Sequence, residues 1–126
     1  MFEVSVEHTF AAAHALREYN GKCERLHGHN YKVQVSLEGP RLNSIGLLFD
    51  FVDVKRLLRE AAERLDHYFL NEIAPFDKVN PSAENIAKYF FEEIEKGLAS
   101  APPGAPVRLA WVRVWETETC AATYRP

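Results

Sequence analysis

The spacing of apolar residues changes twice along this chain, and this change restricts the possible folds more than any other feature of the sequence. Apolar and polar residues alternate near both ends, which is typical of half-buried β-strands. In the middle, apolar residues recur every three or four positions, which is typical of amphipathic helices. The predicted elements are strands at 2–16 and 26–37, helices at 53–67 and 82–98, and strands at 107–116 and 120–124.

This order predicts a β-β-α-α-β-β chain of the α+β class, with a four-stranded antiparallel sheet and both helices on one of its faces. We expect one domain over residues 1–126, because no repeat, low-complexity tract or long linker divides the sequence. The other face of the sheet and its two edges have no predicted cover. Small sheets with open edges often close by self-association, so we expect an oligomer.

The ends of the two helices carry recognisable signals. Asp50 or Asp53 can cap the first helix, and Ser82 is a good capping residue for the second. Gly97 and the following Pro102-Pro103-Gly104 are predicted to close the second helix.

Composition excludes several classes of protein. A net charge of −3 gives no general reason to expect nucleic-acid binding. The sequence has no apolar run near the roughly 18 residues of a membrane span, and no charged leader before an apolar segment. We therefore expect a cytoplasmic protein, in which Cys23 and Cys120 are free thiols.

Three histidines are the first candidates for chemistry. His27 and His29 lie two residues apart on a predicted strand, so their imidazoles share a face. An antiparallel first strand can bring His14 opposite them. Three imidazoles leave a fourth position open, which is the composition of a catalytic zinc site. The alternative is that each histidine is an ordinary strand residue with hydrogen-bond partners, but the pattern of three favours a metal site.

Cys23 lies four residues before His27, and this spacing allows two roles. The thiol could be a fourth zinc ligand. It could equally be a reactive thiol beside the metal, acting as a base or nucleophile. The residues alone do not decide between these roles.

Two further sites have a chemical and an ordinary interpretation. The first helix is predicted to run to about Leu65-Asp66-His67, where Asp66 could orient a proton-moving His67. The residues alone favour a solvent-facing Asp66 and a histidine placed at the helix C-terminus. Glu116 could receive a substrate with paired N–H donors, although a carboxylate at a strand end is more often a solvated turn residue.

Five motifs together resemble the 6-pyruvoyltetrahydropterin synthase family, and the resemblance covers the whole chain in order. The motifs are F-A-A-A-H-A (10–15), C-E-R-L-H-G-H-N-Y (23–31), L-D-H (65–67), N-P-S-A-E-N (80–85) and W-E-T (115–117). The three-residue spacer between Cys23 and His27 is closer to the bacterial branch that makes 6-carboxy-5,6,7,8-tetrahydropterin (QueD).

The resemblance implies the tunnelling fold, in which β-β-α-α-β-β subunits join their sheets around a central barrel. The family commonly forms a homohexamer of two trimers, with active sites between subunits. The resemblance also implies a zinc ion held by His14, His27 and His29.

The same resemblance assigns roles to four other residues. Cys23 matches the family's catalytic cysteine, which abstracts a proton and does not bind the metal. Asp66 and His67 match the carboxylate and imidazole of the proton relay, and a neighbouring subunit can supply them. Glu116 matches the residue that anchors the pterin ring through its 2-amino and N3 edge.

The implied activity is that of a zinc-dependent lyase. It would convert 7,8-dihydroneopterin triphosphate to 6-carboxytetrahydropterin, with release of acetaldehyde and triphosphate, on the route to queuosine and other 7-deazapurines. The alternatives are a 6-pyruvoyltetrahydropterin synthase and a noncatalytic zinc- or pterin-binding oligomer. Arg17, Lys22 and Arg25 are candidates for binding the triphosphate.

Overall fold

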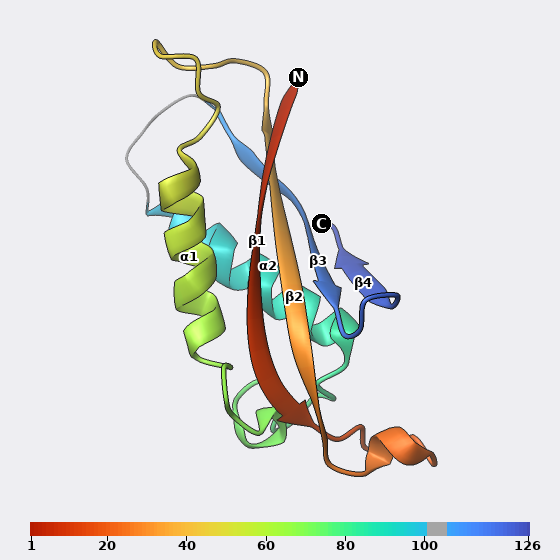
Figure 1. The fold of residues 1–126 in the computed structure, drawn as a ribbon. Helices are drawn as coiled ribbons and strands as arrows, with labels where there is room; N and C mark the ends of the chain where they lie inside the picture. Colours follow the sequence, from red (N-terminus) through yellow and green to blue (C-terminus); the bar gives the residue numbers. More distant parts are fainter. Residues whose placement is uncertain (101–105) are drawn as a thin grey trace.

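The computed structural model describes residues 1–100 and 106–126, and in these residues four strands form one antiparallel sheet (Figure 1). The strands are β1 (Phe2–His14), β2 (His27–Gly39), β3 (Arg108–Trp115) and β4 (Ala121–Tyr124), in the spatial order β1-β2-β3-β4. The helices are α1 (Phe51–Glu63) and α2 (Ala83–Ala99), with short 3-10 turns η1 (Lys22–Glu24) and η2 (Leu70–Glu72). The predicted α+β class and β-β-α-α-β-β order are confirmed.

The two longest strands, β1 and β2, pair along their whole length. Their register runs from Phe2 opposite Gly39 to His14 opposite His27. Since residues directly opposite each other project to the same face of a sheet, this register decides which side chains meet at the far end of the hairpin.

One face of the sheet is covered by both helices, as predicted (Figure 1). The core between sheet and helices is built from alternate strand residues and from the apolar stripes of the helices. Its largest fully buried side chains include Tyr31, Phe76, Phe90, Leu37, Leu58, Leu65, Leu70, Ile86 and Ile94.

The helix ends differ in detail from the sequence-based prediction. Asp50 caps α1, and its side chain accepts a hydrogen bond from the Val52 amide. The helix ends at Glu63, so Asp66 and His67 lie beyond it. Helix α2 ends at Ala99, one residue beyond the predicted range, so Gly97 lies inside the helix and does not close it. A Cβ on Gly97 would lie 2.5 Å from a methyl group of Leu57, so this glycine allows the two helices to approach closely.

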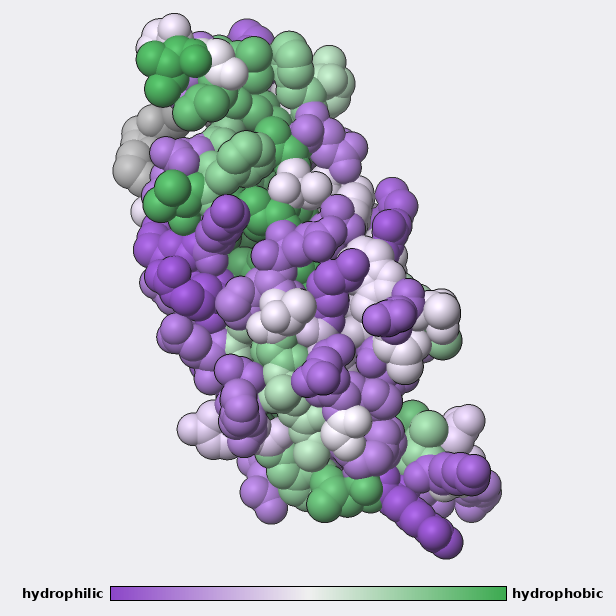
Figure 2. Space-filling view, viewed as in Figure 1, coloured by the Kyte–Doolittle hydropathy of each residue, from purple (hydrophilic) through white to green (hydrophobic). Residues whose placement is uncertain are grey.

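The predicted stop at Pro102-Pro103-Gly104 lies outside the described residues. The uncovered face of the sheet is mainly hydrophilic, while apolar side chains gather at the end formed by the N-terminus and the loop after β2 (Figure 2). The exposed apolar residues of this loop and of the first turn of α1 are Leu42, Ile45, Leu47, Phe51 and Val52. Within the described residues, no helix is long and apolar enough to cross a membrane.

Candidate metal centre

Three strands bring four potential metal ligands together at one end of the core. His14 is the last residue of β1, and His27, the first residue of β2, is its direct partner. His29 lies two residues further along β2 and therefore on the same face. Glu116 follows β3, two residues beyond Val114, whose side chain is buried in the same core.

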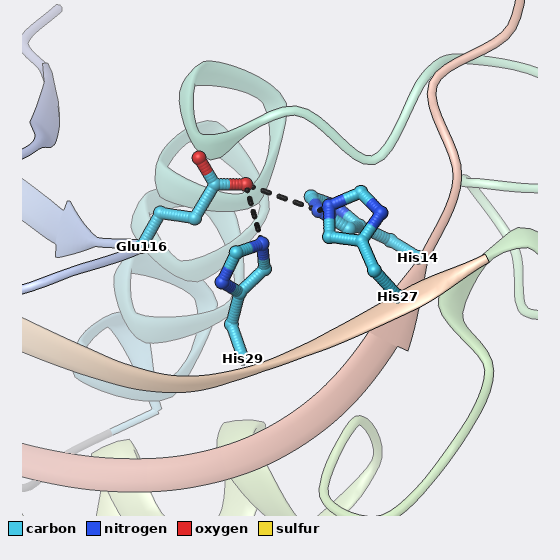
Figure 3. A group of neighbouring side chains, drawn as sticks. All are labelled: His14, His27, His29 and Glu116. Carbon is cyan, nitrogen blue, oxygen red and sulfur yellow. Dashed lines mark hydrogen bonds and ion pairs between the residues drawn. The ribbon is translucent and has the colours of Figure 1, made fainter. Parts of the chain in front are cut away.

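The ligand atoms of these residues converge on one point (Figure 3). The Nε2 atoms of His14 and His27 are 2.9 Å apart. One oxygen of Glu116, Oε1, lies 3.0 Å from His14 Nε2 and 3.2 Å from His29 Nε2. All four atoms lie within 4.8 Å of one another. Ligands held about 2.0–2.1 Å from a tetrahedral zinc are about 3.3–3.4 Å apart, so the separations suit such an ion.

Hydrogen bonds at the Nδ1 atoms of His14 and His27 fix the tautomers of these two rings. His14 Nδ1 lies 2.7 Å from the Pro81 carbonyl oxygen, and His27 Nδ1 lies 2.7 Å from the Arg25 carbonyl oxygen. A carbonyl oxygen only accepts, so both Nδ1 atoms donate and both Nε2 atoms of the neutral rings carry lone pairs. Two lone pairs facing each other at 2.9 Å repel unless a proton or a cation lies between them.

His29 supplies an independent indication that the group binds a cation. Its Nε2 atom is buried and forms no hydrogen bond among the described residues, although Glu116 Oε1 lies 3.2 Å away. Buried polar atoms without partners are rare and point to a missing ion or water. The four residues can therefore hold a metal ion.

Burial also favours the metal-binding form of two of the imidazoles, those of His14 and His29. Loss of solvent lowers the pKa of His14, against the opposing effects of the Pro81 hydrogen bond and the Glu116 charge. The pKa of His29 is lowered by burial too, again opposed by Glu116. A neutral imidazole has the lone pair that a metal requires. Behind the cluster, burial raises the pKa of Tyr31, whose hydroxyl lies 3.1 Å from His14 Nδ1 and remains protonated.

Cys23 is not part of the converging set among the described residues. It is a half-buried free thiol in η1, beside the histidine cluster in sequence. Its carbonyl oxygen accepts a 2.7 Å hydrogen bond from the Leu16 amide, which ties η1 to the chain just beyond β1.

Asp66 and His67 form a pair on the outer edge of β1. Asp66 Oδ1 accepts hydrogen bonds from the Ala11 amide at 2.9 Å and lies 2.9 Å from His67 Nδ1. His67 has a positive φ of 65° and its amide donates to the Ala11 carbonyl oxygen at 2.6 Å. Its side chain is 82% exposed, so the imidazole points away from the core. The carboxylate orients the imidazole because the helix has already ended.

The basic residues near Cys23 have different surroundings. The Arg17 guanidinium donates to the carbonyl oxygens of Phe76 at 2.7 Å and Val79 at 3.3 Å, so it holds a loop in place. Lys22 and Arg25 instead line an open cavity of about 510 Å³. Of the three triphosphate candidates, only these two face free space.

Sequence reasoning missed the residues that support the cluster from behind. Asn71 and Asn80 each form two hydrogen bonds with the chain just beyond His14. The Pro81 carbonyl oxygen accepts from His14 itself. The only available signal was the Asn80-Pro81 step before α2, because a residue before proline is held in an extended conformation.

The fold and the site together define an α+β protein with a cluster of three histidines and a carboxylate that can hold a metal. The family model described as 6-pyruvoyl tetrahydropterin synthase matches residues 3–126. The chain belongs to this family.

Three similar proteins illustrate the relationship. A 6-carboxy-5,6,7,8-tetrahydropterin synthase of Synechocystis is 36% identical over 129 residues, covering 98% of this chain and 93% of that protein. A dihydroneopterin monophosphate aldolase of Pyrococcus furiosus is 36% identical over 108 residues, covering 86% and 83%. The structure of Caenorhabditis elegans 6-pyruvoyl tetrahydropterin synthase has a TM-score of 0.83 at 28% identity, covering 100% of this chain and 97% of that one.

Proposed function

We propose that this chain is a zinc-dependent 6-carboxy-5,6,7,8-tetrahydropterin synthase. It converts 7,8-dihydroneopterin triphosphate to 6-carboxytetrahydropterin, acetaldehyde and triphosphate, and atom balance requires that a water molecule is consumed. The observation that carries the proposal is the convergence of three imidazoles, with the Nε2 atoms of His14 and His27 facing each other at 2.9 Å, in a chain whose relatives of similar length include such synthases.

His14, His27 and His29 are the residues that would hold the zinc ion. When bound, zinc polarises oxygens of the substrate side chain and acidifies the adjacent C–H and O–H bonds. The residues of the chain then have to bind the pterin, hold it in one orientation and move protons. The hydrogen bonds at Nδ1 of His14 and His27 hold the rings in the tautomer that this arrangement needs.

Glu116 is the proposed anchor of the pterin ring. One of its carboxylate oxygens lies against the imidazoles, and the other points away from them (Figure 3). Glu116 also lines an open cavity of about 380 Å³ beside the start of α2. Paired N–H donors of a pterin edge suit a carboxylate in a bidentate contact, and binding in this mode requires Oε1 to leave the imidazoles.

Cys23, Asp66 and His67 are the proposed proton-transfer groups. Cys23 lies outside the converging ligand atoms, which supports a base over a fourth ligand. Asp66 orients His67 so that the Nε2 atom faces outward. This position on the outer edge of β1 supports a site completed between subunits, with the histidine acting beside the metal centre of another copy. A homohexamer of two trimers is the assembly we propose.

A product assay tests the activity. Purified zinc-loaded protein incubated with 7,8-dihydroneopterin triphosphate should release acetaldehyde and the 6-carboxy product. Accumulation of a 6-pyruvoyl product alone would instead identify a 6-pyruvoyltetrahydropterin synthase. Absence of any turnover with stoichiometric zinc present would leave a noncatalytic binding protein.

The 36% identity to a dihydroneopterin monophosphate aldolase favours one further candidate activity. The same assay with 7,8-dihydroneopterin monophosphate distinguishes it. A synthase should prefer the triphosphate, because triphosphate is its leaving group. Faster turnover of the monophosphate would overturn the proposed reaction and leave the metal centre unaffected.

A further inference from the structure

We propose that Asn71 and Asn80 are positioning residues that hold His14 in its metal-binding orientation. Both act through the backbone of residues 15–17, which follows His14. Asn80 also acts through the next residue, Pro81, whose carbonyl oxygen accepts from His14. This inference rests on the metal centre of the proposed function but not on the reaction assigned to it.

Both asparagines pair with the chain as a neighbouring strand would. The Asn71 amide group accepts from the Ala15 N–H at 2.9 Å and donates to the Ala15 carbonyl at 2.8 Å. The Asn80 amide group accepts from the Arg17 N–H at 2.8 Å and donates to the Arg17 carbonyl at 3.0 Å. A side-chain amide has the donor and acceptor of a peptide group, so each asparagine replaces one residue of a strand.

These hydrogen bonds continue a series along the outer edge of β1 that begins at Ala11. The N–H and C=O groups of alternate residues on a strand point to the same edge. On this edge the Ala11 carbonyl oxygen accepts from the His67 amide at 2.6 Å, and the Ala13 amide donates to the Tyr68 carbonyl oxygen at 3.1 Å. Ala15 and Arg17 follow in the same series. The asparagines therefore extend the pairing of β1 past its last residue, which is His14.

Asn80 also sets the acceptor of His14. It directly precedes Pro81, whose buried carbonyl group lies 2.7 Å from His14 Nδ1. The proline restricts Asn80 to an extended conformation, and the Asn80 carbonyl oxygen accepts from the Asn85 side chain at 2.8 Å. The position of the Pro81 carbonyl is thus fixed relative to Arg17 on one side and to α2 on the other.

The loop between the two asparagines is held in the same way. Arg17 donates to the carbonyl oxygens of Phe76 at 2.7 Å and of Asn71 at 3.4 Å. The backbone of residues 15–17 and the loop of residues 71–81 are consequently joined by hydrogen bonds around His14, which is fully buried. The N-P-S-A-E-N motif then contributes more than a helix cap: its first residue orients a ligand.

The expected effect follows from how outer hydrogen bonds act on metal ligands. Loss of such a bond weakens metal affinity by about 10–100-fold. Asn80→Ala leaves the His14–Pro81 hydrogen bond itself in place, so we expect it to weaken zinc binding by no more than this range, and Asn71→Ala to weaken it less, because Asn71 is further along the chain from Pro81. Asn80→Asp keeps the acceptor for the Arg17 amide but places a charged carboxylate oxygen against the Arg17 carbonyl oxygen in place of the donor, so it should also weaken zinc binding.

The test measures metal binding directly. Zinc affinity is obtained by competition with a chromophoric chelator, and the ligand field by the visible absorption of the Co²⁺-substituted protein. Asn43→Ala is a matched control, since the Asn43 side chain also accepts two backbone hydrogen bonds, from Ile45 and Leu47 at 3.0 Å each, but far along the chain from the site. Thermal unfolding of each metal-free variant shows whether it is folded.

Weaker zinc binding and a changed Co²⁺ spectrum in Asn80→Ala and Asn80→Asp, with Asn43→Ala like the unmodified protein, is the expected result. Unchanged affinity and spectrum in folded Asn80→Asp would overturn the inference, even if stability fell, because the role would then be structural only. If the unmodified protein binds zinc but makes no 6-carboxy product, the proposed reaction fails while this comparison still decides the role of Asn80.

Discussion

The thiol of Cys23 and the imidazole of His27 lie close in sequence but should behave differently when removed. Replacing a proton-transfer group typically lowers turnover by about 10²–10⁴-fold. Cys23→Ala should therefore lose turnover to this extent and keep about one zinc per chain, because the thiol is outside the converging ligand atoms. His27→Ala should lose the metal itself. Metal analysis together with the product assay checks both; zinc lost from Cys23→Ala would make the cysteine a ligand.

The buried histidines should also make the metal-free protein sensitive to acid. Burial lowers the pKa of His14 and of His29 below the ordinary value of 6.5. In the unfolded chain both return to that value, so below it the unfolded state binds more protons and the free energy of unfolding falls as the pH falls. Urea unfolding of the metal-free protein between about pH 7.5 and pH 5.5 should show this loss.

The comparison that isolates the effect is the double variant His14→Asn/His29→Asn. Its stability should change less with pH over the same interval, whatever its absolute value, because the two groups that take up protons on unfolding are gone. An equal pH dependence in both proteins would mean that other groups cause it.

At the scale of single elements, the start of α2 offers a direct test of a capping residue. The Ser82 hydroxyl accepts a 3.2 Å hydrogen bond from the Asn85 amide. Ser82→Ala removes this acceptor and should lower the free energy of unfolding by about 1 kcal/mol. Ser82→Thr retains a hydroxyl and should cost less. Denaturant unfolding of the two variants under the same conditions checks this; equal losses would show that the hydroxyl does not matter.

The elements themselves were largely predictable from the sequence. The change of period placed all four strands and both helices, because burial on one face imposes that period directly. The role of Gly97 in α2 was not predictable in this way. Gly97 resembles a helix stop, but it remains helical because the missing side chain leaves room for Leu57 of α1. That contact depends on how the helices pack, which local spacing does not contain.

The candidate site was likewise predictable only where its contacts depend on local spacing. The proximity of His14, His27 and His29 could be predicted from the sequence, because a hairpin register and a two-residue spacing are local properties. The position of Glu116 against those imidazoles depends on where β3 ends relative to β2. The support from Asn71 and Asn80 depends on the path of a loop with no regular structure. Such contacts depend on the tertiary structure and produce no periodic pattern in the sequence.

At the scale of the whole molecule, the uncovered face of the sheet is polar but not featureless. Lys32 lies 3.9 Å from the Glu7 carboxylate and 4.2 Å from the centre of the Trp115 ring. Arg113 lies 4.7 Å from the centre of the Trp111 ring. A face of charged and aromatic groups over β1 to β3 is compatible with a partly hydrated interior, which is what the sheets of a barrel-forming oligomer would enclose.

If active sites form between subunits, two inactive variants should restore each other. His27→Ala lacks a metal ligand, whereas His67→Ala lacks the outward-facing imidazole that would act on a neighbouring copy. In mixed oligomers, an intact metal centre of the His67→Ala chain meets an intact His67 of the His27→Ala chain. Activity should therefore reappear after the two proteins are dissociated, mixed and reassembled.

The matched control is a mixture of His67→Ala with Asp66→Ala, in which both chains lack the same half of the site, so that no combination is complete. Native mass measurement establishes that mixed oligomers have formed in each case. Restored turnover in the first mixture alone would support shared sites. Mixed oligomers without any turnover, or a protein that remains monomeric and active, would place the whole site within one chain, and the exposed His67 would then need to move towards its own metal centre.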